Sequence, residues 1–267
     1  MRLKRIFVAG LLLLGGTFEV ANALDVSVTP VPVPEAMGVI GDSIAAGYAV
    51  GSSNSWASGE DINSHLTRLK RLFPIVEAHN VATPGAYMIA FASQANTLVS
   101  THPNVGYVTV SLGAADVCLP LGGSAPVPSE FRAQFRSGLT TLKNGLPNVK
   151  ILATSIPNLR SMQNAMLRAG RPGTSNFCTR FFDNPGSSAP SDVARRNLVM
   201  REVKTLNAII RQECLKVSGC KFDNGAVFKH RWVSAEIHED GIHPTVAGQK
   251  MMAQITWRSG YRWSTPN

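Results

Sequence analysis

Short apolar segments alternate along this chain with longer segments whose apolar residues recur at helical spacing. The strand-like segments lie at 39–40, 75–82, 107–112 and 149–156, with a last short strand expected at 226–228. The helix-like segments lie at 62–72, 86–99, 128–146, 191–217 and 245–257. This alternation predicts an α/β fold, in which a parallel sheet carries helices on both faces.

The first 23 residues have the pattern of a secretory signal peptide. Arg2, Lys4 and Arg5 form a charged start, residues 6–16 are apolar, and Ala21-Asn22-Ala23 matches a small-x-small cleavage site. An apolar run of about 11 residues is too short to span a bilayer, which needs about 20. We therefore expect a secreted or periplasmic protein, with no membrane segment after cleavage.

Three alternate prolines follow the expected cleavage site. Pro30, Pro32 and Pro34 favour extended backbone over helix, so residues 24–36 are expected to form an extended leader. Hydrophobic content of 44% is enough for one large core, and residues 37–267 are expected to form a single domain.

The chain has four cysteines, Cys118, Cys178, Cys214 and Cys220. An even number in an exported protein favours disulfides, although four buried thiols are the alternative. Three pairings are possible. Cys214 and Cys220 are close enough in sequence to join a helix end to the next turn, which leaves Cys118 with Cys178. The ligand spacing of a structural zinc site is missing, so no metal is expected.

The formal net charge of the chain is +9, and loss of the signal leaves 23 basic and 16 acidic residues, about +7. This basic excess favours a soluble surface, or attraction to anionic lipid headgroups or acidic envelope polymers. The basic residues are scattered without aromatic neighbours, so nucleic acid is not an expected partner.

Several chemically reactive residues occur at loop-like positions. Ser43 directly follows the first strand, and Asp240 and His243 stand three residues apart near the C-terminus. A serine hydroxyl needs an imidazole to accept its proton and a carboxylate to orient that imidazole. Gly85 and the turn at 113–116 also follow strands directly, so we expect them at the same edge of the sheet as Ser43.

Four sequence blocks, Gly41-Asp42-Ser43, Gly85, Gly113-Ala114-Ala115-Asp116 and Asp240-x-x-His243, occur in an order that resembles the SGNH (GDSL-type) hydrolase family. Asp116-Val117-Cys118, Ser155-Ile156-Pro157 and His243-Pro244-x-x-x-Gly248-Gln249 resemble its secreted bacterial esterase and lipase branch. The resemblance covers about residues 39–257. It implies a flavodoxin-like three-layer α/β/α sandwich with a five-stranded parallel sheet.

The resemblance also implies roles for individual residues. Ser43 would be the nucleophile, His243 the general base and then acid, and Asp240 the residue that orients His243. The oxyanion would be held by the backbone N–H groups of Ser43 and Gly85. No cofactor is implied.

One position departs from the family pattern. Ala115 stands where the family has an asparagine whose amide helps to bind the oxyanion. Loss of one such donor costs about 100- to 1000-fold in rate, roughly 3 to 4 kcal/mol. Another amide, such as that of Asn80 or Asn158, could occupy the place.

Simpler interpretations exist for several of these residues. Ser43 could merely cap a helix after Asp42, and Asp240 could merely form a turn with Gly241. The histidines at 238 and 243 are interrupted by a glycine, unlike a helical zinc motif. Trp56 could line an acyl pocket or belong to the core. His65, His79, His102 and His230 have no evident carboxylate partner and are expected at surface or structural positions.

The segment between Asn158 and Pro190 is too long for a plain connector. It is expected to form a loop that is held by Cys178 and serves as a substrate-selecting wall.

Taken together, the sequence predicts a secreted monomeric serine esterase or lipase acting on a small-molecule or lipid ester. The alternatives are an O-deacetylase of envelope polysaccharide, and a lipid- or glycan-binding protein weakened in catalysis by Ala115.

Overall fold

The computed structural model describes residues 30–173 and 176–265, so the predicted signal peptide at 1–23 lies outside the described residues. A sheet of five parallel strands forms its centre, in the order β3-β2-β4-β5-β6. The strands are β2 (Ala36–Gly41), β3 (Glu77–Asn80), β4 (Val105–Ser111), β5 (Lys150–Ala153) and β6 (Cys220–Phe222). Every residue of β2 is buried, as expected for a central strand covered on both faces.

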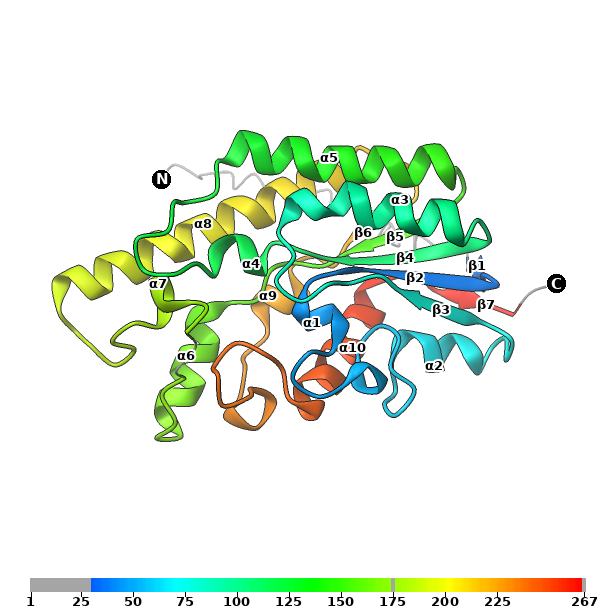
Figure 1. Ribbon diagram of the computed structural model, residues 1–267. Helices are drawn as coiled ribbons and strands as arrows, with labels where there is room; N and C mark the ends of the chain where they lie inside the picture. The colour runs from blue at the N-terminus through cyan, green and yellow to red at the C-terminus, as the bar shows by residue number, and fades with distance from the viewer. Residues whose placement is uncertain (1–29, 174–175, 266–267) are drawn as a thin grey trace, which may run out of the picture.

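Helices cover both faces of this sheet (Figure 1). One layer contains α3 (Phe91–Thr101), α5 (Pro128–Gly145) and α8 (Pro190–Cys214). The other contains α2 (His65–Lys70) and α10 (Val246–Ser259). The predicted three-layer α/β/α architecture with a five-stranded parallel sheet is therefore confirmed.

Shorter helices occupy the connections. They are α1 (Ser43–Ala46), α4 (Ala114–Val117), α6 (Leu159–Arg168), α7 (Thr179–Phe182) and α9 (Ala226–Lys229), with the 3₁₀ turns η1 (Ser52–Asn54), η2 (Met88–Ala90) and η3 (Ser234–Glu236). Among the described residues, no helix combines the length and the apolar character that crossing a membrane requires.

Glycines allow α3 to pack closely against strand β2 and against its neighbour α5. A Cβ at Gly38 in β2 would lie 2.5 Å from Leu98 Cδ1, and one at Gly138 in α5 would lie 2.1 Å from Phe91 Cγ. Both distances are too short for a real contact, so a larger residue at either position would push α3 away from β2 or from α5. This packing holds α3 against the end of β2, where the first sequence block lies.

Two predicted segments differ from the structure. Residues 226–228 belong to helix α9, while the last strand of the sheet is β6, just before them. The long segment after Asn158 is not a plain loop, because it contains α6 and α7. Leu159, Met162 and Met166 are buried on one face of α6, at the spacing of an amphipathic helix.

The ordered fold also extends further toward the N-terminus than the predicted start at Met37. Strand β1 (Val31–Pro32) pairs in parallel with β7 (Trp263–Ser264), and Val33 and Ala36 are buried. A proline is tolerated there because this two-stranded pair has only edge strands. The second half of the expected leader is thus part of the domain.

Two disulfides join separate elements. Cys118 after α4 is bonded to Cys178 before α7, and Cys214 at the end of α8 is bonded to Cys220 at the start of β6. The first attaches the long segment after α6 to the third sequence block, and the second fixes the end of α8 to the edge of the sheet.

Candidate active site

Ser43 lies at the carboxyl end of the central strand β2 and is the first residue of α1. Asp42 caps this helix, and its Oδ1 accepts a hydrogen bond from Ile44 N–H at 3.0 Å. A Cβ at Gly41 would lie 2.4 Å from Ala45 Cβ and 2.8 Å from Ser111 O, so only glycine fits this strand-to-helix turn. The turn presents Ser43 at the edge of the sheet where ligands bind in such folds.

Two buried glutamines hold the backbone around Ser43. Gln94 in α3 accepts a hydrogen bond from Gly41 N–H at 2.9 Å and donates one to Gly41 O at 3.0 Å. Gln249 in α10 accepts from Trp56 N–H and donates to Ile44 O. Gln249 belongs to the sequence block that begins at His243, whereas Gln94 was not singled out in the sequence.

His243 links the two distant parts of the chain. Its Nε2 lies 2.9 Å from Ser43 Oγ, and its Nδ1 lies 2.6 Å from Asp240 Oδ2. The other carboxylate oxygen, Asp240 Oδ1, accepts hydrogen bonds from the backbone N–H groups of Ile242 and His243, each at 2.9 Å. With Nδ1–H directed at the carboxylate, the lone pair of Nε2 faces the serine hydroxyl.

Asp240 is held in its charged form. Burial alone would raise its pKa, but hydrogen bonds from the His243 side chain and from the two backbone N–H groups outweigh that effect and lower the pKa. A second imidazole also approaches this carboxylate, because His238 Nδ1 lies 3.3 Å from Asp240 Oδ2. The charged carboxylate is placed to stabilise an imidazolium at His243.

The second and third sequence blocks adjoin the first. Asp42 N–H donates to Ser111 O at the end of β4, and Thr83 N–H donates to Gly41 O. Asp116 joins these two blocks, because its Oδ2 accepts a hydrogen bond from Met88 N–H at 2.9 Å. The three blocks that contain Ser43, Gly85 and Ala115 therefore follow neighbouring strands at one sheet edge.

Two buried carboxyl groups near Ser43 have strongly raised pKa values. Burial raises the pKa of Asp42 to about 7, although the Ile44 N–H and the His243 imidazole oppose the rise. Burial likewise raises the pKa of Asp116 to about 6, against the effect of its hydrogen bond from Met88. Neither group was expected from the sequence to titrate near neutral pH.

Hydrogen bonds within the fold engage both Asn80 and Asn158, the two residues considered for the amide that the family pattern has at position 115. Ala115 itself is a half-buried residue of α4. Asn80 Nδ2 donates to Ala45 O at 3.1 Å and to Ser58 Oγ at 2.9 Å, so both of its amide hydrogens are used. Asn158 caps α6 by accepting a hydrogen bond from Ser161 N–H.

Two backbone donors remain as candidates for an oxyanion. Within residues 30–173 and 176–265, the N–H groups of Ser43 and Gly85 have no hydrogen-bond acceptor. Gly85 is exposed with φ of +79°, a left-handed conformation that favours glycine. The turn therefore leaves the N–H of Gly85 exposed at the carboxyl edge of the sheet.

Trp56 and His65 belong to the core. Trp56 is fully buried with its ring against that of His65, which excludes it from an open acyl pocket. His65 lies between Tyr107 Oη and Thr256 Oγ1, and burial lowers its pKa to about 3. His230, for which no carboxylate partner was expected, lies 2.8 Å from Glu236.

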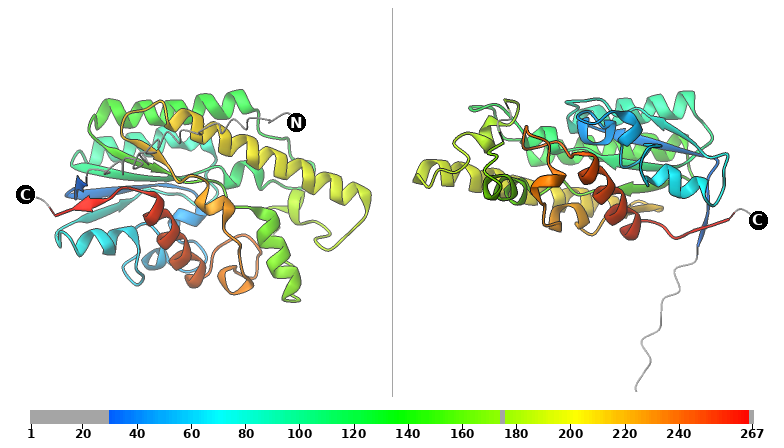
Figure 2. Two further views of the ribbon diagram at one scale, coloured as in Figure 1. Left: turned by 180° about the vertical axis from the view of Figure 1, so that it is seen from behind. Right: turned by 90° about the horizontal axis from the view of Figure 1, so that it is seen from below.

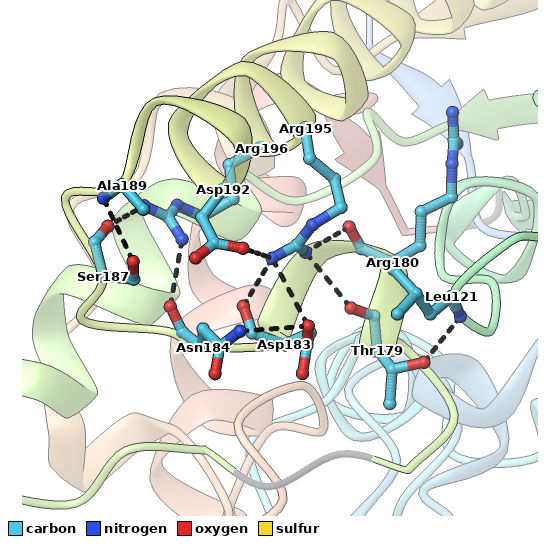
Figure 3. Close-up of polar contacts among 10 residues, drawn as sticks. All are labelled: Leu121, Thr179, Arg180, Asp183, Asn184, Ser187, Ala189, Asp192, Arg195 and Arg196. Atoms are coloured by element: carbon cyan, nitrogen blue, oxygen red, sulfur yellow. Dashed lines mark hydrogen bonds and ion pairs between the residues drawn. The ribbon is translucent and has the colours of Figure 1, made fainter.

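Hydrogen bonds from two arginines fix the long segment before α8 against that helix. The Arg195 guanidinium donates to the carbonyl oxygens of Thr179, Arg180 and Asp183 and to Asp192 Oδ1 (Figure 3). Arg196 contacts the carbonyl oxygens of Asn184 and Ser187 in the same network. These bonds hold residues 179–187 on the first turns of α8.

The same segment also contacts the region after the third block and the loop that carries His243. Leu121 N–H donates to Thr179 Oγ1 at 2.7 Å, beside the Cys118–Cys178 disulfide. A Cβ at Gly173 would lie 2.6 Å from Gly241 Cα, so the two backbones touch. Across the described part of the chain, no group of three or more His, Cys, Asp or Glu residues is arranged to hold a metal ion.

The model of the GDSL-like lipase/acylhydrolase family matches residues 39–251, which include Ser43, Asp240 and His243. The chain belongs to this family. Two solved structures similar to this GDSL-family chain are LAE5, an alpha/beta hydrolase from the metagenome of Lake Arreo in Spain, and the psychrotrophic esterase EstA from Pseudoalteromonas sp.. Comparison with curated protein sequences finds no match.

The two structural neighbours share the fold at low sequence identity. LAE5 is 15% identical with a TM-score of 0.57, and the match covers 86% of this chain and 96% of LAE5. EstA is 13% identical with a TM-score of 0.52, and the match covers 84% of this chain and 96% of EstA. The family match over residues 39–251 covers most of the described domain.

Proposed function

We propose that this GDSL-family protein hydrolyses carboxylic esters through an acyl-enzyme on Ser43. The observation that carries the proposal is the continuous hydrogen-bonded series from Ser43 through His243 to Asp240. Its order and geometry match what a serine nucleophile requires, namely a base within about 2.6–3.2 Å and a third group that orients the base.

In the first half of the reaction, Ser43 Oγ attacks the ester carbonyl carbon while His243 Nε2 takes the hydroxyl proton. Asp240 stabilises the resulting imidazolium. His243 then gives that proton to the leaving alcohol oxygen as the tetrahedral intermediate collapses. In the second half, His243 takes a proton from water, the hydroxide attacks the acyl-enzyme, and the proton returns to Ser43 Oγ as the acid leaves.

The negative charge on the tetrahedral oxygen would be held by the N–H groups of Ser43 and Gly85. The alanine at 115 removes the third donor that the family pattern supplies, so we expect turnover to be slow. Loss of one donor of this kind costs about 100- to 1000-fold in rate.

An exposed aromatic ring beside His243 supports an ester with an apolar acyl part. The ring of Tyr48 lies 5.2 Å from the imidazole of His243 and is 57% exposed. The two disulfides further support a site of action in an oxidising compartment, outside the cytoplasm.

A fluorophosphonate probe tests this proposal. The probe is expected to label the wild-type protein and not Ser43→Ala. Ser53→Ala, at an exposed serine in η1, is the matched control and should leave labelling intact. Absence of labelling at neutral pH in a folded protein would favour the second candidate, a binding protein weakened in catalysis, which the alanine at 115 supports.

A panel of p-nitrophenyl esters from acetate to palmitate would then define the acyl length. Acetylated glycans in the same panel test the alternative of a polysaccharide O-deacetylase.

A further inference from the structure

A groove outside the catalytic residues carries an unusual concentration of positive charge. It has a volume of about 660 Å³ and lies between α6, α8 and the segment that follows α9. In the view from behind, α6 lies at an angle to α8, beside that segment (Figure 2). Its lining contains five basic side chains and no acidic one: Arg160, Arg168, Arg201, Lys204 and Arg231.

These five side chains differ from the other arginines packed against α8. Arg132 and Arg136 pair with Glu213, and Arg180 pairs with Glu202. Within the described ranges, none of the five basic residues of the groove forms an ion pair with a carboxylate. Like charges gathered in this way repel one another, so an anionic ligand would relieve a cost that the free protein bears.

The charges are arranged along the two helices rather than around one point. Arg160, Asn164 and Arg168 follow one face of α6 at four-residue steps, and Asn197, Arg201 and Lys204 follow one face of α8. A rise of about 1.5 Å per residue separates Arg160 and Arg168 by about 12 Å along the helix axis. One phosphate or carboxylate cannot reach both ends, whereas an extended chain with repeated anionic groups can.

The uncharged lining favours a polyhydroxylated ligand over a membrane or a nucleic acid. Asn158, Asn164 and Asn197 place amide groups between the cations. The two apolar lining residues, Met200 and Trp232, are 8% and 1% exposed, so neither can insert into a bilayer or stack on a base. The groove is also recessed, whereas a membrane surface is flat on this scale.

We propose that the groove between α6 and α8 binds an acidic polysaccharide through its five basic side chains. Asn158, the cap of α6, follows β5 at the same sheet edge as Ser43, and Ser161 Oγ contacts both His230 O and Trp232 N–H. The groove thus adjoins the segment that leads to His243. Hydrolysis of an ester group on such a polymer at Ser43 is a step that rests on the proposed esterase function.

Binding of polygalacturonate to the full chain, measured by isothermal titration calorimetry, tests the proposal without requiring turnover. Arg168→Gln/Arg201→Gln removes one exposed cation from each helix of the groove. This variant should weaken binding about tenfold or more for each charge-assisted hydrogen bond that it removes. Lys204→Gln/Arg231→Gln is a second groove variant, with the same expected direction.

A matched control separates the groove from the net charge of the protein. Arg71→Gln/Lys250→Gln changes two exposed basic residues outside the groove, so it lowers the net charge by the same amount as each groove variant. It should bind polygalacturonate as the wild type does. Weaker binding in both groove variants, with wild-type affinity in the control, would support the proposal.

Four outcomes would overturn the proposal. These are no binding of polygalacturonate, equal binding of neutral dextran, equally weakened binding in the control variant, and binding only to phosphatidylglycerol vesicles or to a DNA duplex. Calorimetry measures binding and not hydrolysis. The binding result therefore tests the groove even if the fluorophosphonate experiment contradicts the proposed esterase function.

Discussion

Gln94 forms hydrogen bonds with both backbone groups of Gly41, two residues before Ser43. The contact joins α3 to the end of β2 across 53 positions of sequence. Since Gly41 has no side chain and sits in a sharp turn, this amide fixes the backbone that carries Ser43. The precision of the Ser43–His243 contact therefore depends on a residue that forms no hydrogen bond with either of them.

Replacement of Gln94 by leucine is expected to lower the free energy of unfolding by about 1 to 3 kcal/mol, because it leaves the buried N–H of Gly41 without a partner. Urea denaturation measures this change, and ester hydrolysis should fall with it. Gln163→Leu is the matched control, since Gln163 is similarly buried but its Nε2 has no partner among the described residues. Equal effects of the two substitutions would argue against the assigned role.

Asp240→Asn is expected to reduce kcat for an activated ester by about 10⁴-fold, as loss of the orienting carboxylate does in serine hydrolases. An asparagine can still accept the backbone hydrogen bonds of Ile242 and His243, so the loop should remain folded. Steady-state kinetics with circular dichroism on the same samples checks both statements. A decrease of less than tenfold in a folded variant would mean that another group, such as His238, sets the tautomer of His243.

Helices and strands whose apolar residues recur at regular spacing over many positions were predicted correctly from the sequence. Short elements defined by few residues were missed. The helix at 128–146 and the strand at 107–112 match α5 and β4 closely because their patterns extend over many positions. A run of three apolar residues is too short to show either the helical or the strand repeat, so residues 226–228 were wrongly assigned to a strand. The left-handed Gly225 that caps the start of α9 was not recognised as a helix signal. Helix α6 was missed among polar neighbours.

The candidate site divides in a similar way. Ser43, Asp240 and His243 could be named because their chemistry is read from residue type and block order. The roles of Gln94 and Gln249 depend on contacts with backbone groups 53 and 193 positions away, which local pattern does not contain. The raised pKa of Asp42 likewise depends on burial by elements far apart in the chain.

The buried carboxyl of Asp42 should give the protein a distinctive pH dependence. Its pKa of about 7 lies above the value of about 4 for an unfolded chain. The folded state therefore holds this proton more tightly, so the contribution to stability is complete below about pH 4 and disappears as the pH rises toward 7. Asp116, with a pKa of about 6, acts in the same direction.

Asp42→Asn should flatten this decline between about pH 5 and 7, since its amide oxygen can still cap α1 without titrating. Urea midpoints at half-unit pH steps measure the effect. Asp61→Asn, at an exposed position, should retain the wild-type decline. A wild-type protein whose stability rises steadily across this pH range would contradict the assignment.

The two disulfides should differ in their contribution to stability. In the chain-entropy model, the closure across 60 residues between Cys118 and Cys178 contributes about 4 kcal/mol, and that across 6 residues between Cys214 and Cys220 about 2 kcal/mol. Paired serine substitutions, compared by urea denaturation, should show the larger destabilisation for Cys118→Ser/Cys178→Ser. The reverse order would mean that the segment attached by Cys118–Cys178 contributes little to the cooperative unfolding of the domain.

Ala115→Asn is expected to raise kcat on p-nitrophenyl acetate, because it restores an amide donor at the position where the family pattern has one. The gain should reach at most the roughly 100- to 1000-fold, about 3 to 4 kcal/mol, that one such donor supplies elsewhere. Ala115→Asp has nearly the same shape but no amide hydrogens, and it places a carboxylate near the developing negative charge, so it should lower kcat. If both variants change turnover alike, shape at position 115 matters rather than hydrogen bonding. If neither exceeds the wild type, the N–H groups of Ser43 and Gly85 already provide what the reaction needs.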